Sequence, residues 1–241
     1  MQTKLDAAKA DLLRKAAAAA ENSQVGGAAP GEGLSNGALA AYLHHYYLHT
    51  APEDVISRDP VDLYGAAASH YRLGLKRPQG TAEVRVSTPT VEENGWSCGH
   101  TVVEVVTDDM PFLVDSVTNE LTRLDRAIHL VVHPQLAVRR DITGKLLEIL
   151  DVDACNRAQA AGAEWPADAV VESWMHIEID RETDREDLRT IEANLRRVLG
   201  DVREVVEDWS KMRDSALRLA DELAEEPPRT CPSRRSARPG S

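Results

Sequence analysis

The spacing of apolar residues at the start of the chain is that of an α-helix. Within residues 3–21, which are rich in Ala, Leu, Lys and Asp, the side chains of Leu5, Leu12 and Leu13 fall along one side. The next stretch, 22–37, is dominated by Gly, Pro and Ser, a composition typical of a flexible linker. We therefore predict an N-terminal helix over residues 1–21 that is followed by this linker.

Two further helices are predicted before the period of the pattern changes. One spans about 37–49 and ends ahead of Pro52, because a residue that precedes proline disfavours the helical conformation. The other follows Asp59-Pro60 and ends near Arg77, with the aspartate as its N-cap and the proline at its first helical position. Together they define a helical segment over residues 38–78.

Beyond Pro78 the period shortens toward two, which is typical of β-strands. Strands are predicted at 81–88, 101–107, 128–139, 146–152 and 170–180, with a hairpin turn at 141–145. The run 101–107 is apolar on both faces and is therefore expected in the centre of a sheet. In the last strand the residues expected to face the core are Val171, Trp174 or Met175, Ile177 and Ile179.

Amphipathic helices separate and follow these strands. One apolar stripe begins after Asp109 and comprises Leu113, Val114, Val117, Leu121 and Leu124. Two helices are predicted near the end of the chain, one from Asp184 to about Leu199 and one from about Val202 to Glu225. Helices followed by the order β-α-β-β-β-α-α indicate an α+β fold with a largely antiparallel sheet. We assign residues 79–200 to this domain and 201–226 to a C-terminal helix.

The last residues, 227–241, differ in composition from the rest. Residues 229–241 contain four arginines and no acidic residue, on a chain whose formal net charge is −12. One interpretation is a disordered tail. The interpretation that we favour is a frameshift or assembly artefact, because one inserted nucleotide near Thr230 lets GC-rich codons spell an acidic, helix-prone sequence. In that case the chain is the front of a longer protein.

The composition narrows the possible partners and the compartment. The net charge of −12 argues against nucleic acid and anionic membranes, since phosphate groups are bound by basic surfaces. No apolar run approaches the ~20 residues that span a bilayer, and the N-terminus lacks a signal sequence, so we expect a cytoplasmic protein. The three cysteines, Cys98, Cys155 and Cys231, are too far apart to indicate a disulfide framework or a zinc site.

Several pairs of residues have the spacing of a chemical site, but a simpler explanation is favoured for each. His45 and His49, and likewise His129 and His133, share one face, as metal ligands do, although surface or packed side chains are more common. Cys98 and His100 resemble a thiolate–imidazole pair in what reads as an ordinary loop. The sequence has no G-x-G-x-x-G motif after a strand and no Walker loop. We therefore predict no catalytic residue, no metal and no cofactor bound by this chain.

Asp108 and Asp109 stand where a strand gives way to a helix. Carboxylates at a helix N-terminus are stabilised by capping and by the helix dipole. We expect Asp109 to be the cap, with Met110 and Pro111 at the first two helical positions, and Asp108 to point outward as a free carboxylate. Asp108 then remains available to a regulatory ligand.

The segment 101–134 resembles an ACT-type regulatory domain, whose signature is an apolar strand, Asp-x-Pro-Gly-Leu-Leu and an amphipathic helix. Asp109, Pro111, Leu113 and Val114 match it, while Phe112 stands where that family usually has glycine. The resemblance implies a ferredoxin-like antiparallel sheet with helices on one face, preceded here by the N-terminal helical segment. It also implies that Phe112 fills the pocket that the glycine leaves open, or is buried at a contact between subunits.

Most of residues 40–226 is similar to the N-terminal region of the large bacterial NAD-specific glutamate dehydrogenases, above all in "MPFLVDSV". The resemblance implies a regulatory or assembly segment of an enzyme that oxidises L-glutamate to 2-oxoglutarate and ammonia with NAD, whose catalytic residues lie beyond this chain. It further implies self-association through the sheet or the helices and an amino-acid effector. The residues implied for a ligand or an interface are Asp108, Asp109, Met110, Pro111, Phe112 and Asp115. Two alternatives are a stand-alone amino-acid sensor and a purely structural oligomerisation module.

Overall fold

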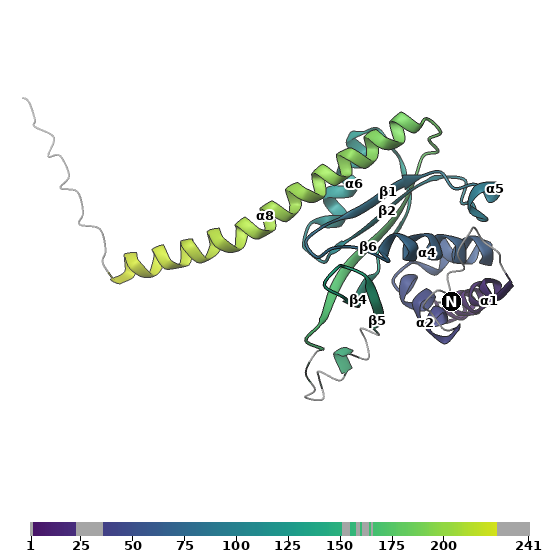
Figure 1. Ribbon diagram of the computed structural model, residues 1–241, viewed down its shortest axis with the longest axis horizontal. Coiled ribbons are helices and arrows are strands. Elements are labelled where there is room, and N and C mark those ends of the chain that lie inside the picture. The colour runs from purple at the N-terminus through teal and green to yellow at the C-terminus, as the bar shows by residue number, and fades with distance from the viewer. Residues whose placement is uncertain are drawn as a thin grey trace, which may run out of the picture. The chain divides into compact units, whose positions relative to one another are not determined.

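The computed structural model describes residues 2–22, 36–150, 155–157, 160, 164 and 166–225 (Figure 1). Most of the predicted linker and the whole unusual tail, 227–241, lie outside these residues. Met1–Val202 form one compact unit and Arg203–Ser241 a second. Among the described residues, no helix combines the length and the apolarity that crossing a bilayer requires.

The element order places helices first and then a sheet with helices inserted. The helices are α1 (Gln2–Asn22), α2 (Asn36–Tyr46), α3 (Pro52–Ile56), α4 (Pro60–Gly74), α5 (Val91–Asn94), α6 (Leu113–Arg123) and α8 (Arg185–Glu225). The strands are β1 (Glu83–Ser87), β2 (Thr101–Asp108), β3 (Ile128–Val132), β4 (Gln135–Arg140), β5 (Leu146–Leu150) and β6 (Ala169–Ile179). The start of α4 is as predicted, because Asp59 Oδ1 accepts a hydrogen bond of 2.8 Å from the Val61 amide.

The strands form one antiparallel sheet in the order β1-β2-β6-β4-β5, with β3 also paired to β6. Strand β6 is central: β2 pairs along one side of it, and β3 and β4 pair in succession along the other. The strand predicted at 128–139 is thus interrupted at Pro134, which lacks an amide N–H but accepts a hydrogen bond of 3.0 Å from the Trp174 amide. Because β6 lies between β2 and β3, the unit β2-α6-β3 is a split β-α-β motif, and the predicted α+β class is confirmed.

Helices cover both faces of the sheet. Helix α6 and the first part of α8 lie on one face, while α4 and the helices beside it lie against the other (Figure 1). On β6 the side chains of Met175, Ile177 and Ile179 alternate with those of Trp174, His176 and Glu178, and all of them are buried. On the second of these faces Trp174 packs against Tyr42 and Glu178 accepts a hydrogen bond from Arg58, so the N-terminal helices supply the cover of that face.

Two further expectations are wrong, one about a pair of helices and one about a side chain. The helices predicted at 184–199 and 202–225 are a single helix, α8, because one glycine, Gly200, costs only about 1 kcal/mol inside a helix whose apolar stripe continues past it. Val171 does not face the core: it is 37% exposed, because the buried part of β6 begins only at Glu172.

Candidate functional site

The roles predicted for the two aspartates at the end of β2 are wrong. Asp108 is half-buried and accepts hydrogen bonds from Arg77 Nη2 at 2.7 Å and from the Gly80 amide at 3.0 Å, so it is not a free carboxylate. Asp109 is exposed and accepts one bond of 2.9 Å from Gln135 Nε2. Neither caps α6, because the helix begins at Leu113 and its N-cap is Phe112, which provides no side-chain cap.

Phe112 is exposed and its backbone is left-handed. Its φ is 70° and the residue is 63% exposed, so the expectation that its ring is buried is wrong for this chain by itself. A left-handed residue with a Cβ is strained, which explains why a glycine suits this position. Met110 is half-buried beside it, while Pro111 and Asp115 are exposed. The structure therefore brings the six predicted residues into one loop and helix start.

The buried charges lie instead on the sheet face beneath the N-terminal helices. Glu172 on β6 is fully buried and accepts hydrogen bonds from two arginines: Arg77, with Nη2 at 2.6 Å from Oε1, and Arg140, with Nη2 at 2.8 Å from Oε2. Trp174 Nε1 also donates to it at 3.0 Å. Burial lowers the pKa of Arg77, but the charges of Glu172 and Asp108 and their hydrogen bonds outweigh this effect and raise it.

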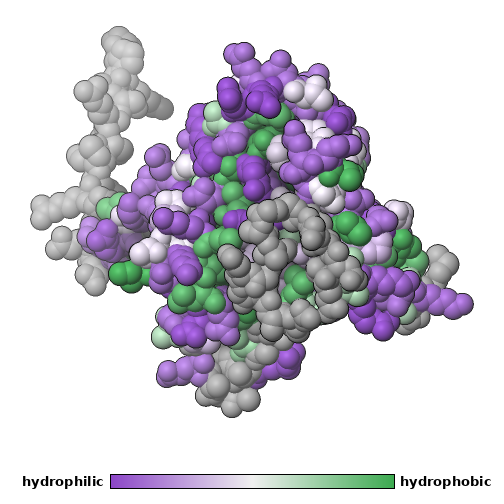
Figure 2. Space-filling view, turned by 45° about the vertical axis from the view of Figure 1, so that its right-hand side comes forward, coloured by the Kyte–Doolittle hydropathy of each residue, from purple (hydrophilic) through white to green (hydrophobic). Residues whose placement is uncertain are grey.

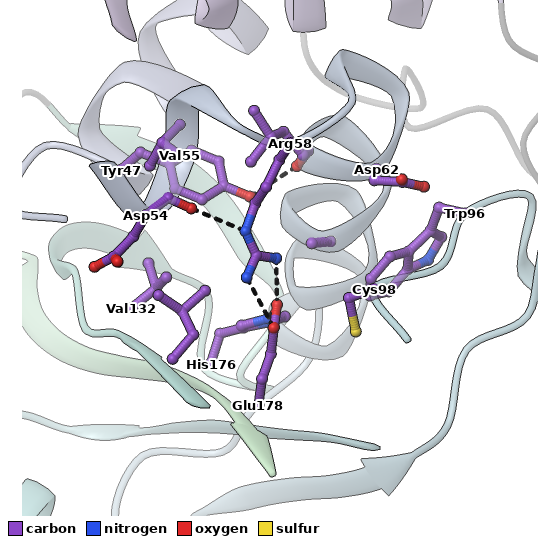
Figure 3. Close-up of a pocket in the computed structure, with 13 residues that line it drawn as sticks. Tyr47, Asp54, Val55, Arg58, Asp62, Trp96, Cys98, Val132, His176 and Glu178 are labelled. Atoms are coloured by element: carbon purple, nitrogen blue, oxygen red, sulfur yellow. Dashed lines mark hydrogen bonds and ion pairs between the residues drawn. The ribbon is translucent and has the colours of Figure 1, made fainter. Parts of the chain in front are cut away.

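A second buried charge pair lies at the other end of β6 (Figure 3). Glu178 is fully buried, and its two oxygens accept hydrogen bonds from Arg58 Nη1 at 2.5 Å and from Nη2 at 2.8 Å. His176 Nε2 lies 3.5 Å from the same carboxylate and His100 Nδ1 lies 3.2 Å from it. Burial raises the pKa of Glu178, but hydrogen bonds from His176 and Arg58 prevail and lower it to about 2. Glu178 is therefore ionised at neutral pH.

A cavity of about 10 Å³ lies beside this pair, which is room for about one water molecule. Tyr47, Val55 and Trp96 are among the residues that line it, together with Cys98 and Glu178 (Figure 3). Burial raises the pKa of the Cys98 thiol to about 11, so the thiolate that a nucleophile or a metal ligand requires is disfavoured. The cavity is too small to hold an amino acid.

Cys98, His100 and Glu178 place ligand atoms within 4.8 Å of one another, a set of donors that zinc accepts. Both oxygens of Glu178, however, already accept hydrogen bonds from the Arg58 guanidinium, whose positive charge repels a cation at this distance. We therefore interpret the cluster as a charge pair that joins α3–α4 to the sheet. The other histidine pairs do not form sites: His129 contacts Asp180 at 2.7 Å and His133 contacts Ser173 at 2.5 Å, while His49 is exposed.

A third pair completes this face. Arg85 on β1 donates to Glu104 on β2 at 2.7 Å and to Ser69 on α4 at 2.8 Å. The three buried acids on this face of the sheet are thus each paired with an arginine. Arg58 and Arg77 come from the helical segment, and Arg85 comes from β1. The arrangement is suited to attaching one structural layer to another.

Residues 42–195 match the family described as glutamate dehydrogenase, ACT1 domain, which is more than half of the chain. The chain belongs to this family. It is 36% identical over 182 residues to the NAD-specific glutamate dehydrogenase of Halomonas elongata, a match that covers 76% of the chain and 11% of that relative. The corresponding enzyme of Pseudomonas aeruginosa is 35% identical over 181 residues, 75% of the chain and 11% of the relative. The NAD-specific glutamate dehydrogenase of Mycobacterium tuberculosis is 31% identical over 155 residues, which is 64% of the chain and 9% of that relative.

These matches confirm the resemblance and the ACT-like fold. The chain spans about a tenth of the length of the curated relatives that it matches. Of the six site residues predicted for this ACT1 domain, Asp108 is the one that forms an ion pair with a buried arginine, Arg77. Sequence analysis missed Arg58, Arg77, Glu172 and Glu178. The signal available for the two acids was their position on one face of a strand whose residues from 172 to 179 are all buried.

Proposed function

We propose that this chain is the N-terminal regulatory and assembly segment of a cytoplasmic NAD-dependent glutamate dehydrogenase. The parent reaction is the conversion of L-glutamate, NAD and water to 2-oxoglutarate, ammonia and NADH, and it takes place in parts of the longer protein outside this chain. The observation that carries the proposal is the ACT1 match over residues 42–195, in a chain that spans about a tenth of its NAD-specific relatives.

The chemistry of the buried groups supports a role without catalysis for this segment. Glu172 and Glu178 are each held by arginine, and the Cys98 thiol is protonated at neutral pH. Proton transfer requires a base that reaches the substrate, and these carboxylates do not reach solvent. Their role in the proposal is to hold the N-terminal helices on the sheet as one rigid module.

The test is an assay of the purified chain for glutamate-dependent reduction of NAD, followed by absorbance at 340 nm. We expect no rate above that of a blank without protein, in a sample whose circular dichroism shows the folded α+β spectrum. Turnover that requires both glutamate and NAD would contradict the proposal.

The alternative of a stand-alone amino-acid sensor has less support. The carboxylate that was expected to receive a ligand's ammonium group, Asp108, is bound to Arg77 and to the Gly80 amide, so a ligand would have to displace both. Calorimetric titration of the chain with glutamate and other amino acids distinguishes the two functions. Saturable binding at one site per chain would favour the sensor, and its absence supports an assembly role.

A further inference from the structure

The part of α8 in the second unit carries apolar side chains that are exposed in the described part of the chain. Val205, Trp209, Met212 and Leu219 are 60%, 63%, 61% and 57% exposed, and Ala216 between them is exposed as well. We refer to these five residues as the α8 stripe. Single exposed apolar residues are common on protein surfaces, but a continuous row of them marks an interaction surface.

The spacing of the stripe is that of a coiled coil. Its members follow one another at intervals of four, three, four and three residues, which is a strict heptad pattern with Trp209 and Ala216 at a and Val205, Met212 and Leu219 at d. A helix that packs on a globular core has a wider apolar face, with a third row of apolar residues. Here one flanking row, the g positions Asp208, Ser215 and Glu222, is entirely polar. The narrow seam therefore fits another helix better than a sheet.

The charged residues beside the stripe indicate which helix packs against it. In a parallel pair of identical helices, residue g of one contacts residue e of the other, five positions further along. Asp208 at g then faces Arg213 at e of the second copy, and by symmetry this ion pair forms twice. In an antiparallel pair the g rows face one another, which would bring Asp208 and Glu222 of one copy against the acidic row of the other. Both partners are exposed, and in the described part of the chain Asp208 accepts a hydrogen bond from Lys211 while Arg213 donates one to Asp214, each on the same helix.

We propose that the α8 stripe is covered by a second copy of this chain, in a parallel two-stranded coiled coil over Val205–Leu219 that is fastened by Asp208–Arg213 pairs between the copies. This pairing is independent of the reaction proposed above, and it names a surface on the helix, distinct from the sheet, for self-association.

Light scattering coupled to size-exclusion chromatography of the full chain tests the proposal. We expect a dimer of twice 26.4 kDa whose population rises with concentration. Met212→Glu introduces a charge at the centre of the seam and should weaken dimerisation at least tenfold. The matched control is Leu217→Glu, because Leu217 is similarly exposed, at 58%, on the same helix but lies outside the stripe. That variant should dimerise like the wild type.

Exchange of the charges tests the direction of the pair. Arg213→Asp alone should weaken the dimer, and Asp208→Arg combined with Arg213→Asp should restore it, because the pair forms again with its ends exchanged. A wild-type chain that stays monomeric would overturn the proposal and leave the stripe to another segment of a longer protein. Equal effects of Met212→Glu and Leu217→Glu would overturn the stripe as the interface. A double variant as weak as Arg213→Asp would overturn the parallel arrangement.

Discussion

At the scale of single residues, Glu172 is a buried carboxylate that accepts hydrogen bonds from three different side chains. Arg77, Arg140 and Trp174 all donate to it, and Arg77 extends the network to Asp108. Removing one partner from a buried charge pair leaves the other charge uncompensated, which typically costs about 3–5 kcal/mol. The stability of this ACT1 domain therefore depends on a few polar residues as well as on its apolar core.

The first prediction separates the two aspartates at the end of β2. Asp108→Ala should lower the free energy of unfolding by about 1–3 kcal/mol, because the buried Arg77 guanidinium and the Gly80 amide each lose an acceptor. Asp109→Ala removes one exposed hydrogen bond that Gln135 donates, and it should change the free energy of unfolding by less than about 0.5 kcal/mol. Urea denaturation followed by circular dichroism gives both values. A larger loss for Asp109→Ala would contradict these roles.

The second prediction concerns the strained backbone of Phe112. Its left-handed conformation costs about 1–2 kcal/mol for a residue with a Cβ, and the exposed ring contributes little packing. Phe112→Gly should therefore stabilise the chain by up to about 1 kcal/mol, after subtraction of the entropy that glycine loses on folding. Phe112→Ala is the control, since it removes the ring but keeps the strain, and it should bring no gain. A loss of about 3 kcal/mol for Phe112→Gly would mean that the ring is packed after all.

At the scale of elements, what could be predicted from the sequence depended on local patterns. The cap at Asp59 and the two-faced apolar strand β2 follow from neighbouring residues, and both are as expected. The start of α6 was misplaced because Asp109, the expected cap, instead accepts a hydrogen bond from Gln135, which is 26 residues away in the chain, and the helix begins only after Phe112. Arg58 and Glu178 are separated by 120 residues in the chain, so no periodicity could indicate that they meet.

The third prediction tests the continuity of α8 with a matched pair of glycines. A Cβ at Gly200 would meet nothing within 4 Å, so Gly200→Ala should stabilise the helix by about 0.5–1 kcal/mol. A Cβ at Gly74, in α4, would lie 2.2 Å from Trp174 Cη2, so Gly74→Ala should be clearly destabilising. Thermal unfolding of both variants is the measurement. Destabilisation by Gly200→Ala would indicate two helices with a break between them.

At the scale of the whole first unit, the N-terminal helices and the sheet are joined by charge pairs that cross from one layer to the other. Arg58, just after α3, reaches Glu178 on β6, and Arg77, just after α4, reaches Glu172 on the same strand. Trp174, between the two acids, packs among Tyr42 and the other residues of the core formed with the helices. We therefore expect the helices and the sheet to unfold together.

The fourth prediction concerns the acid stability of this joint. The pKa of Glu178 is about 2 in the folded chain, below its ordinary value of 4.5. Its ionised form therefore stabilises the fold in full above pH 4.5, and this contribution, on the order of 3 kcal/mol, is lost as the pH falls toward 2. In Glu178→Gln this part of the pH dependence should be absent, so the difference in unfolding free energy between wild type and variant should shrink from pH 5 to pH 3. A difference in unfolding free energy that stays constant from pH 5 to pH 3 would contradict the lowered pKa of Glu178.

The central place of β6 has a consequence for synthesis of the chain. β2, β3 and β4 all pair with β6, yet β6 is the last of the described strands to leave the ribosome, 71 residues after the end of β2 if counted from Asp108 to Ile179. At about 5–20 residues per second, the interval is about 4–14 s. Until β6 is made, β2 can pair only with β1, and β4 only with β5 once Leu150 is made, while Arg58 and Arg77 still lack Glu178 and Glu172. Cotranslational folding of this domain must therefore wait for a single late strand, and the seconds before it emerges are when chaperones have most to bind.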